Sequence, residues 1–416
     1  MKRILRKMTS MCIAVAVVAA MGLTSLAVED INGNGSVIGD KDPAAALTSS
    51  LIIEKELTAY NPITTQVYAP NITYTYAIAG IDAQKVITDS DGVQATTKPG
   101  PAGAAITSSI SWASTELINA SATGEANRKQ LTIDLSGVTF PGAGVYRYQI
   151  SETCANKAAN GVTEGTISET RYLDVYVRDP KPEEDPGYKI YGYVMFENNN
   201  NIDGRSNATT DTVAQAVKTE GFVTTDDPSS AGASLTADSY YTYNVTVNKV
   251  LENDKANESH GFPFEFVYTK ATGVTGNFNL VASYTADPVA MAASVQTTIA
   301  HGNSVTYKGI PCGTKVDIIE TNDISTAAYK VTTTNANTNV SALLVNYQGT
   351  TGATAVEINA TAVNTAGTAY DVTFTNSLAL ISPTGVIMAV VPFIILLGFG
   401  VGLMVVSTAK RKEDQA

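Results

Sequence analysis

Between about residue 47 and residue 378, apolar and polar residues alternate in short runs separated by glycine, proline and asparagine. A period of two, with no convincing amphipathic helical pattern, predicts β-strands that have one buried and one exposed face. The chain is therefore expected to be all-β and to fold as β-sandwiches. The clearest runs of its first part are 51–57, 72–78, 130–135, 146–150, 171–177 and 188–196.

A polar stretch divides the strand-rich chain into two blocks. Residues 199–238, which begin within a run of asparagines, have no periodic apolar pattern and are expected to form a polar linker or insert. The first block is 47–198. The second block is 239–378, from a strand pattern at 240–249 to one at 370–376. Each block is long enough to bury a core, so two tandem sandwich domains are predicted.

In the first block, three polar residues share strand faces with apolar residues: Lys55, Glu152 and Asn198. Alternation along a strand places all three side chains toward the core. The apolar residues on these faces are Leu51, Ile53 and Leu57 for the lysine, Tyr148 and Ile150 for the glutamate, and Val194 and Phe196 for the asparagine.

The second block repeats this order with Lys249, Glu320 and Asn376. Burying an ionisable group is costly unless it is paired or neutralised, so the repeated set points to chemistry more than to packing. The apolar residues on these faces are Val245, Val247 and Leu251, then Val316 and Ile318, then Val372 and Phe374.

The chemistry that this set suggests is a self-formed isopeptide bond. An apolar site lowers the pKa of the lysine toward the free amine and raises the pKa of the glutamate toward the neutral acid. The amine can attack the asparagine side-chain amide while the glutamate shuttles the proton, so that ammonia leaves. Because the core holds both reactants together, the reaction is one event without turnover, and we expect no enzyme. The alternative is a partly exposed lysine at the mouth of each sandwich, with ordinary polar residues at two strand ends.

The chain around these residues resembles the two-domain streptococcal T-antigen pilins, which are sortase-assembled major pilins. The motifs that carry the resemblance are 144–152, Phe196-Glu-Asn198, 313–320 and Phe374-Thr-Asn376. The resemblance covers essentially the whole mature chain. It implies immunoglobulin-like domains that each contain a Lys–Asn isopeptide bond. The insert at 199–238 departs from the family, in which one domain passes almost directly into the next.

Residues 379–416 contain a short motif, an apolar run and a basic cluster. The motif Ile-Ser-Pro-Thr-Gly occupies 381–385, and the apolar run 386–406 is long enough to cross a bilayer. The basic residues 410–412 would then stay on the cytoplasmic side. An ordinary single-pass membrane anchor is one interpretation of this order.

The same order also resembles a Gram-positive cell-wall sorting signal of the Leu-Pro-X-Thr-Gly type, with serine in place of the usual proline. In that family, a sortase cleaves the Thr–Gly bond, here Thr384–Gly385, and transfers the threonine carboxyl group to an amine. The resemblance implies covalent anchoring through Thr384.

The N-terminus has the features of a secretory signal. Basic residues precede an apolar segment at about 11–23, and Ser25-Leu26-Ala27 provides small residues at the cleavage positions. We expect a signal peptide at 1–27 and a flexible arm at 28–46. A retained N-terminal membrane helix is the alternative.

Composition excludes several other functions. The chain has a formal net charge of −12, which argues against binding to nucleic acid or anionic lipid. Cys12 falls in the signal peptide, and Cys154 and Cys312 fall in different predicted domains, so a disulfide framework is not expected. His260 and His301 are not in metal-ligand spacing or beside a candidate nucleophile. We therefore expect neither a metal nor a cofactor.

Together these patterns predict the shaft subunit of a sortase-built pilus on a Gram-positive surface. Its expected partners are a sortase, copies of itself, minor pilins and peptidoglycan, with the membrane holding its C-terminus before sorting. Lys181, in a proline-rich segment, and Lys189 are the candidate acceptors for the Thr384 carboxyl of the next subunit. A monomeric wall-anchored adhesin is the alternative, and an exported enzyme has little support.

Overall fold

The computed structural model describes residues 47–82, 86–88, 94–197, 199, 219–224, 236–321, 329–335, 340–342, 353–359 and 369–378. The predicted signal peptide, the arm, Asn198 and the sorting signal with Thr384 and Gly385 lie outside them. In the part of the chain that is described, no helix is both long and apolar enough to cross a membrane. The apolar run 386–406 is not in that part.

Strands make up nearly all the regular structure, as the period-two pattern predicts. Two short 3-10 helices, η1 (Ala158–Asn160) and η2 (Lys255–Asn257), are also present. The first strands are β1 (Ser50–Tyr60), β2 (Thr65–Tyr68), β3 (Ile72–Gly80), β4 (Val86–Thr88), β5 (Gln94–Thr96), β6 (Lys98–Pro99), β7 (Ala105–Ile106), β8 (Ser109–Trp112), β9 (Leu117–Ala120), β10 (Glu125–Asp134), β11 (Gly144–Thr153), β12 (Val162–Thr163), β13 (Thr170–Arg178), β14 (Lys189–Phe196) and β15 (Gly221–Phe222). The later strands are β16 (Asp238–Glu252), β17 (Phe262–Thr269), β18 (Asn279–Ala282), β19 (Val289–Ala290), β20 (Ser294–Ile299), β21 (Ser304–Pro311), β22 (Lys315–Thr321), β23 (Tyr329–Asn335), β24 (Val340–Ala342), β25 (Ala353–Asn359) and β26 (Ala369–Leu378).

The N-terminal half, residues 47–237, packs two sheets face to face. One sheet has the order β14-β13-β11-β3-β8, and β1, β10 and β7 form part of the other. Tyr76 of β3 contacts Phe222 of β15 across the core, with ring centroids 5.5 Å apart. Apolar faces from both sheets therefore share one core.

The C-terminal half, residues 238–378, has the same layered plan. One sheet has the order β20-β17-β22-β25-β24, and β18, β21, β16, β26 and β23 form the facing layer. Phe264 of β17 packs edge-to-face on Phe374 of β26, with 5.1 Å between ring centroids. Phe266 contacts Tyr307 of β21 at 4.7 Å in the same way.

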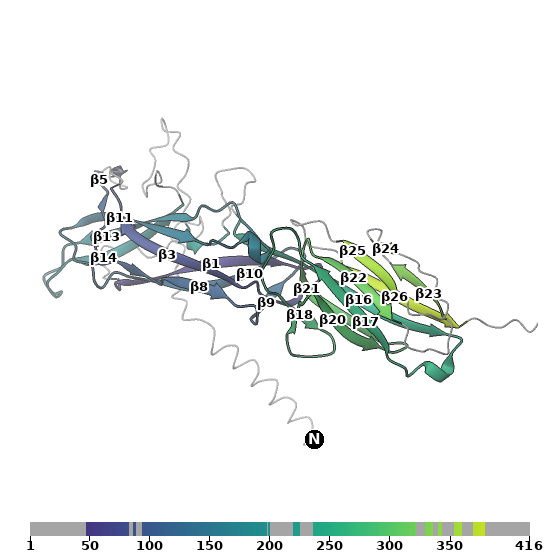
Figure 1. Cartoon of the computed structure of the whole chain (residues 1–416). Coiled ribbons are helices and arrows are strands. Elements are labelled where there is room, and N and C mark those ends of the chain that lie inside the picture. Colours follow the sequence, from purple (N-terminus) through teal and green to yellow (C-terminus); the bar gives the residue numbers. More distant parts are fainter. Residues whose placement is uncertain are drawn as a thin grey trace, which may run out of the picture.

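Strand β16 joins the two halves without a break. Its first residues pair in parallel with β1, from Leu57 opposite Asp238 to Tyr60 opposite Tyr241. Beyond Tyr241, β16 pairs with β21 and in parallel with β26. The two halves consequently lie end to end, as Figure 1 shows, with one strand belonging to both.

Parts of the stretch that the sequence suggested as a linker belong to the N-terminal sheet. Strand β15 pairs in parallel with β1, with Phe222 opposite Lys55. The start of β16 then continues this pairing at Asp238. Pairing of the main chain thus holds residues 221–222 and Asp238 against β1, the first strand of the chain.

Strand β14 differs from the strict alternation that the sequence suggested. Its pairing with β13 shifts register between Tyr176 and Val177. As a result, Val194 and Phe196 lie in a small separate cluster with Val145 and Tyr176. Tyr193 and Met195 face the main core instead. The bulge therefore turns the face that carries Val194 and Phe196 away from the core that contains Ile53 and Leu57.

Candidate functional site

Of the six residues predicted for the two isopeptide sites, five are buried on the apolar faces where alternation places them. Lys55 and Glu152 are each 3% exposed in the N-terminal half. Lys249 and Asn376 are fully buried in the C-terminal half, and Glu320 is 3% exposed. The sixth residue, Asn198, lies outside the described residues. The lysines are therefore not at the mouths of the sandwiches, which removes the alternative of partly exposed amines.

The C-terminal site brings Lys249, Glu320 and Asn376 together from β16, β22 and β26. The lysine Nζ lies 3.0 Å from Glu320 Oε1. The same carboxylate oxygen accepts a hydrogen bond from Asn376 Nδ2 at 2.7 Å. The lysine Nζ also lies 4.4 Å from the centre of the Phe262 ring. One glutamate oxygen thus contacts both the nitrogen that would attack and the nitrogen that would leave.

The electrostatics of this site favour a nucleophilic amine. Burial lowers the pKa of Lys249 to about 8, against the opposing effect of the nearby Glu320 carboxylate. About a tenth of the amine is then unprotonated at pH 7, far more than for a lysine of ordinary pKa, and this is the form that attacks. The buried Asn376 Oδ1 has no hydrogen-bond donor among the described residues. A buried carbonyl left without a donor is costly and needs an explanation other than stability.

Strand order explains why these residues meet. The first and last strands of the C-terminal half, β16 and β26, are parallel neighbours. Phe374 is opposite Lys249, and Asn376 is opposite Leu251, two positions further along. On β22, Glu320 is opposite Phe264 of β17, in the facing sheet. A lysine and an asparagine far apart in sequence therefore point into the core next to each other.

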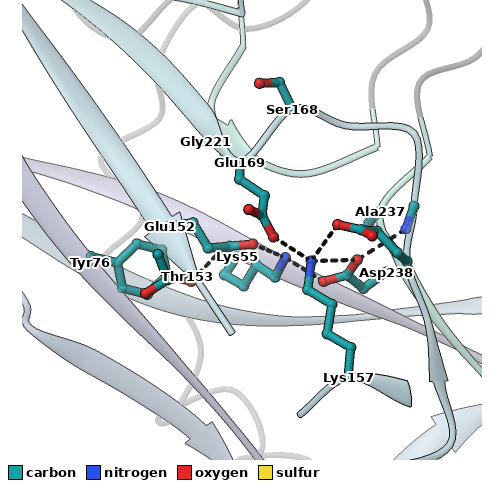
Figure 2. A network of polar contacts seen from close by, with 12 residues as sticks. Lys55, Tyr76, Glu152, Thr153, Lys157, Ser168, Glu169, Gly221, Ala237 and Asp238 are labelled. Atoms are coloured by element: carbon teal, nitrogen blue, oxygen red, sulfur yellow. Dashed lines mark hydrogen bonds and ion pairs between the residues drawn. The ribbon is translucent and has the colours of Figure 1, made fainter. Parts of the chain in front are cut away.

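In the N-terminal site, the third described residue beside the lysine and the glutamate is Asp238. Lys55 Nζ contacts Glu152 Oε1 at 2.8 Å and Asp238 Oδ2 at 3.0 Å, as Figure 2 shows. Tyr76 donates its hydroxyl hydrogen to Glu152 Oε2 at 2.8 Å. The carboxylate of Asp238 is 5% exposed, so the contact with Lys55 is a buried ion pair. The residue at the lysine is an aspartate, where the sequence suggested Asn198.

Two further groups contact the second oxygen of Asp238. The backbone N–H of Gly165 donates to Asp238 Oδ1 at 3.0 Å. Lys157 Nζ lies 3.4 Å from the same oxygen and also contacts Glu164 and Glu169. Gly165 is the residue that fits here, because a Cβ at this position would lie 2.5 Å from the backbone carbon of Ala237.

The pairing registers make Asp238 the counterpart of Asn376. Asp238 is opposite Leu57, two positions beyond Lys55, just as Asn376 is opposite Leu251, two positions beyond Lys249. The surrounding residues also correspond, because each glutamate is paired with an aromatic residue of the neighbouring strand, at Tyr76 and Phe264. Each lysine also lies over the aromatic ring two residues before that partner of the glutamate: Lys55 Nζ is 4.2 Å from the centre of the Tyr74 ring, and Lys249 Nζ is 4.4 Å from that of Phe262.

Sequence reasoning missed Asp238 because it assigned this residue to the polar insert. A signal was present, since Asp238 shares the period-two pattern with Tyr240 and Thr242 at the start of β16, and all three are buried. Recognising it required the register between β1 and β16, which joins positions far apart in the chain.

The candidate acceptor lysines lie at one end of the N-terminal sheet. Lys181 is in the turn that follows β13, where its backbone N–H donates to Glu184 Oε2 at 2.8 Å. Glu184 also forms an ion pair with Arg178 at 2.7 Å, so the turn is held in place. Lys189 is the first residue of β14, and both lysines are half-buried.

A sequence family described as "Domain of unknown function (DUF7601)" matches residues 243–377, about a third of the chain. No curated protein sequence matches. Among solved structures, the chain is similar to the T3.2 major pilin protein of Streptococcus pyogenes, with 19% identity and a TM-score of 0.37. That likeness covers 80% of this chain and 98% of the pilin.

Another major pilin from Streptococcus pyogenes is similar with 18% identity and a TM-score of 0.38, over 80% of this chain and 100% of that one. An adhesin from Mobiluncus mulieris containing intramolecular disulfide, isopeptide and ester bond cross-links has 13% identity and a TM-score of 0.24. The match covers 83% of this chain and 98% of the adhesin. Because the identities and TM-scores are low, these likenesses do not by themselves assign a function to the chain.

Proposed function

We propose that this chain is a structural shaft subunit of a sortase-assembled Gram-positive pilus, built from two tandem immunoglobulin-like domains. In the C-terminal domain, Lys249 and Asn376 form an isopeptide bond that Glu320 promotes. The observation that carries the proposal is the buried Lys249–Glu320–Asn376 set on the first and last strands of the C-terminal half.

The reaction needs no partner molecule. The Lys249 amine attacks the side-chain carbonyl carbon of Asn376 and forms a C–N bond. Glu320 takes a proton from the attacking nitrogen and delivers it to Nδ2, which leaves as ammonia. Atoms and charge balance, and Glu320 is returned unchanged. Proximity in the folded core supplies the acceleration that an enzyme would give to separate reactants.

The position of the bond suits a protein under tension. In the parallel pair β16 and β26, pulling the start of one strand against the end of the other shears the hydrogen bonds between them. Each such hydrogen bond contributes only about 0.5–1.5 kcal/mol of net stability. A covalent bond from Lys249 to Asn376 would carry the force directly, so the residues between them would stay folded under load.

The anchoring part of the proposal rests on the sequence. Export by the N-terminal signal and sortase transfer at Thr384 would join the chain to the wall or to a second copy. In a polymer, the acceptor would be Lys181 or Lys189, which lie at the end of the N-terminal half. The protein would perform no turnover and would need no cofactor.

The first test is mass spectrometry of the full chain and of a Glu320→Gln variant. The unaltered chain is expected to contain a cross-linked peptide joining Lys249 to Asn376, lighter than the sum of its two parts by one ammonia. The variant should lack it while keeping its strand content by circular dichroism. Folded protein with no cross-link between these two residues would overturn the chemistry.

A second test addresses assembly. Wall extracts of cells that express the chain should show a ladder of covalent multimers. Peptide mapping should find Thr384 joined to Lys181 or Lys189. A branch at a different lysine would refute the acceptor sites. A wall-linked species without multimers would instead favour a monomeric adhesin.

A further inference from the structure

We propose that Lys55 is covalently joined to Asp238, not to an asparagine, and that this bond forms with loss of water. The inference rests on the isopeptide chemistry proposed above but concerns a separate site, with a different electrophile. Its structural basis is the direct contact of Lys55 Nζ with Asp238 Oδ2 at 3.0 Å, beside Glu152.

The topology favours Asp238 over Asn198 as the partner. Asp238 occupies the position opposite Leu57 on a parallel neighbour of β1, which corresponds to the position of Asn376 relative to Lys249. The residues that precede Asn198 on its face, Val194 and Phe196, belong to a separate cluster outside the core that contains Ile53 and Leu57.

The condensation balances within the site. Lys55 as an ammonium group carries three hydrogens, and Asp238 as a carboxylate carries none. Once one proton has passed from it to the neighbouring carboxylates, the nitrogen attacks the side-chain carbon of Asp238 and in the product keeps one hydrogen. Glu152 Oε1, 2.8 Å from that nitrogen, relays the other protons, and Oδ2 departs with two hydrogens as water. No oxidant or external group is required, and Glu152 ends in its starting state.

The surroundings of Asp238 differentiate its two oxygens. Oδ2 faces the attacking amine, whereas Oδ1 is held by the Gly165 N–H at 3.0 Å and by Lys157 at 3.4 Å. Attack at the carbon places negative charge on the oxygen that stays, so donors aimed at Oδ1 stabilise the tetrahedral intermediate. This arrangement resembles an oxyanion hole and leaves Oδ2 as the leaving oxygen.

Lys157 is the other lysine near Asp238, but it is placed to remain a cation. Burial alone would lower its pKa, but the charges of Asp238, Glu169 and Glu164 outweigh burial and raise the pKa of Lys157. A protonated amine cannot attack, so Lys157 acts as a positioning residue for Oδ1. Lys55 instead contacts two buried carboxylates, Glu152 and Asp238, to which it can pass a proton, whereas Glu164 and Glu169 beside Lys157 are exposed to solvent.

Bond formation also removes an electrostatic cost. A buried ammonium–carboxylate pair is desolvated on both sides, and that penalty can exceed the attraction between the charges. Converting Lys55 and Asp238 to a neutral amide eliminates both charges from the core while keeping the two strands joined. The fold thus holds the two reacting groups in contact in a buried site where a neutral amide is more stable than the ion pair.

The consequence for mechanics is specific to Asp238. When a single chain is pulled by its two ends, tension entering at β1 would cross to Asp238 and then follow the single strand β16 to Lys249, where the second bond would take it to β26. The only extended chain under load between the two bonds would be residues 238–249, roughly 36 Å of strand. A bond to Asn198 would instead leave residues 199–237 in the load path, adding up to roughly 130 Å of extension.

Peptide mapping of the full chain tests the proposal. We expect a branched peptide that joins Lys55 to Asp238 and is lighter than its parts by one water. Asp238→Asn should still form the bond, with loss of ammonia in place of water. Asp238→Ala should form no bond. Asn198→Ala is the matched control and should leave the branched peptide unchanged. Lys157→Met should slow the appearance of the bond after refolding without preventing it, because its role is to position Oδ1.

The outcomes separate this proposal from the one above. Lys55 unbranched in a folded chain, or joined to Asn198 with loss of ammonia, would overturn it, whatever is found at Asn376. A Lys55–Asp238 branch with no bond at Asn376 would support it while refuting the C-terminal chemistry. Single-molecule stretching of the full chain gives an independent check, since extension by residues 199–237 would contradict the assigned partner.

Discussion

Removing the C-terminal cross-link should lower thermal stability by an amount that loop entropy sets. The bond between Lys249 and Asn376 closes a loop of roughly 130 residues, which by the disulfide relation corresponds to about 5 kcal/mol at room temperature. If the C-terminal half unfolds as one unit of about 140 residues, that loss lowers its melting temperature by roughly 15–20 °C.

The perturbation of choice is Lys249→Met, which keeps an unbranched apolar stem beside Phe262 while removing the amine. Glu320→Gln is the matched companion, because it keeps the lysine but removes the proton shuttle. Lys308→Met, on the neighbouring strand β21 and outside both sites, serves as the control for losing a lysine. Calorimetry should show similar large decreases for the first two variants and little change for the control.

Two results would refute the reasoning. In the first, mass spectrometry shows that the unaltered chain has lost ammonia and that Lys249→Met and Glu320→Gln have not, yet all three proteins have the same melting temperature. The bond would then not govern stability. If Lys308→Met falls as far as the other two, the effect reflects altered packing and not the cross-link.

Two further predictions concern the pH dependence of the Lys249 bond and the buried ion pair of Arg147 with Asp174. When unreacted chain is refolded at a series of pH values, intact mass reports the rate at which the Lys249 bond forms. This rate should rise by about tenfold per pH unit and level off above about pH 8, because only the unprotonated amine attacks. A rate that does not depend on pH would contradict this. Asp174→Ala should destabilise the chain by about 3–5 kcal/mol in denaturant titrations, because it leaves the guanidinium of Arg147 buried without the carboxylate that it contacts at 2.6 and 2.8 Å. The double variant Arg147→Met/Asp174→Leu should recover most of that loss, and no recovery would indicate that lost packing is the cause.

Alternation was enough to place most of the site. Lys55, Glu152, Lys249, Glu320 and Asn376 are all buried, as the apolar residues on either side of each one predicted. These predictions succeeded because the side chains of a strand alternate strictly between its two faces, so neighbours two residues away report which face is buried. The all-β character of the chain follows from the same local period.

Local alternation failed where a strand is irregular. The register shift opposite Tyr176 moves Val194 and Phe196 into a cluster of their own, although their spacing from Ile190 suggested the main core. A bulge adds one residue to one strand of a pair, and one residue is enough to exchange the two faces. Gly192, inside β14 and next to the shift, is a local signal of a bulge, but it does not say by itself which face the following residues take.

The sequence alone determined which residues are buried in regular strands, the order of lysine, glutamate and asparagine in the second block, and the apolar and charged segments at the chain ends. Only the tertiary structure decided which carboxyl or amide meets which lysine. That choice depends on the parallel register of β1 with β16 and of β16 with β26, positions more than a hundred residues apart. Such a register is set by the packing of whole sheets, because the local period of each strand is satisfied equally well at every second position.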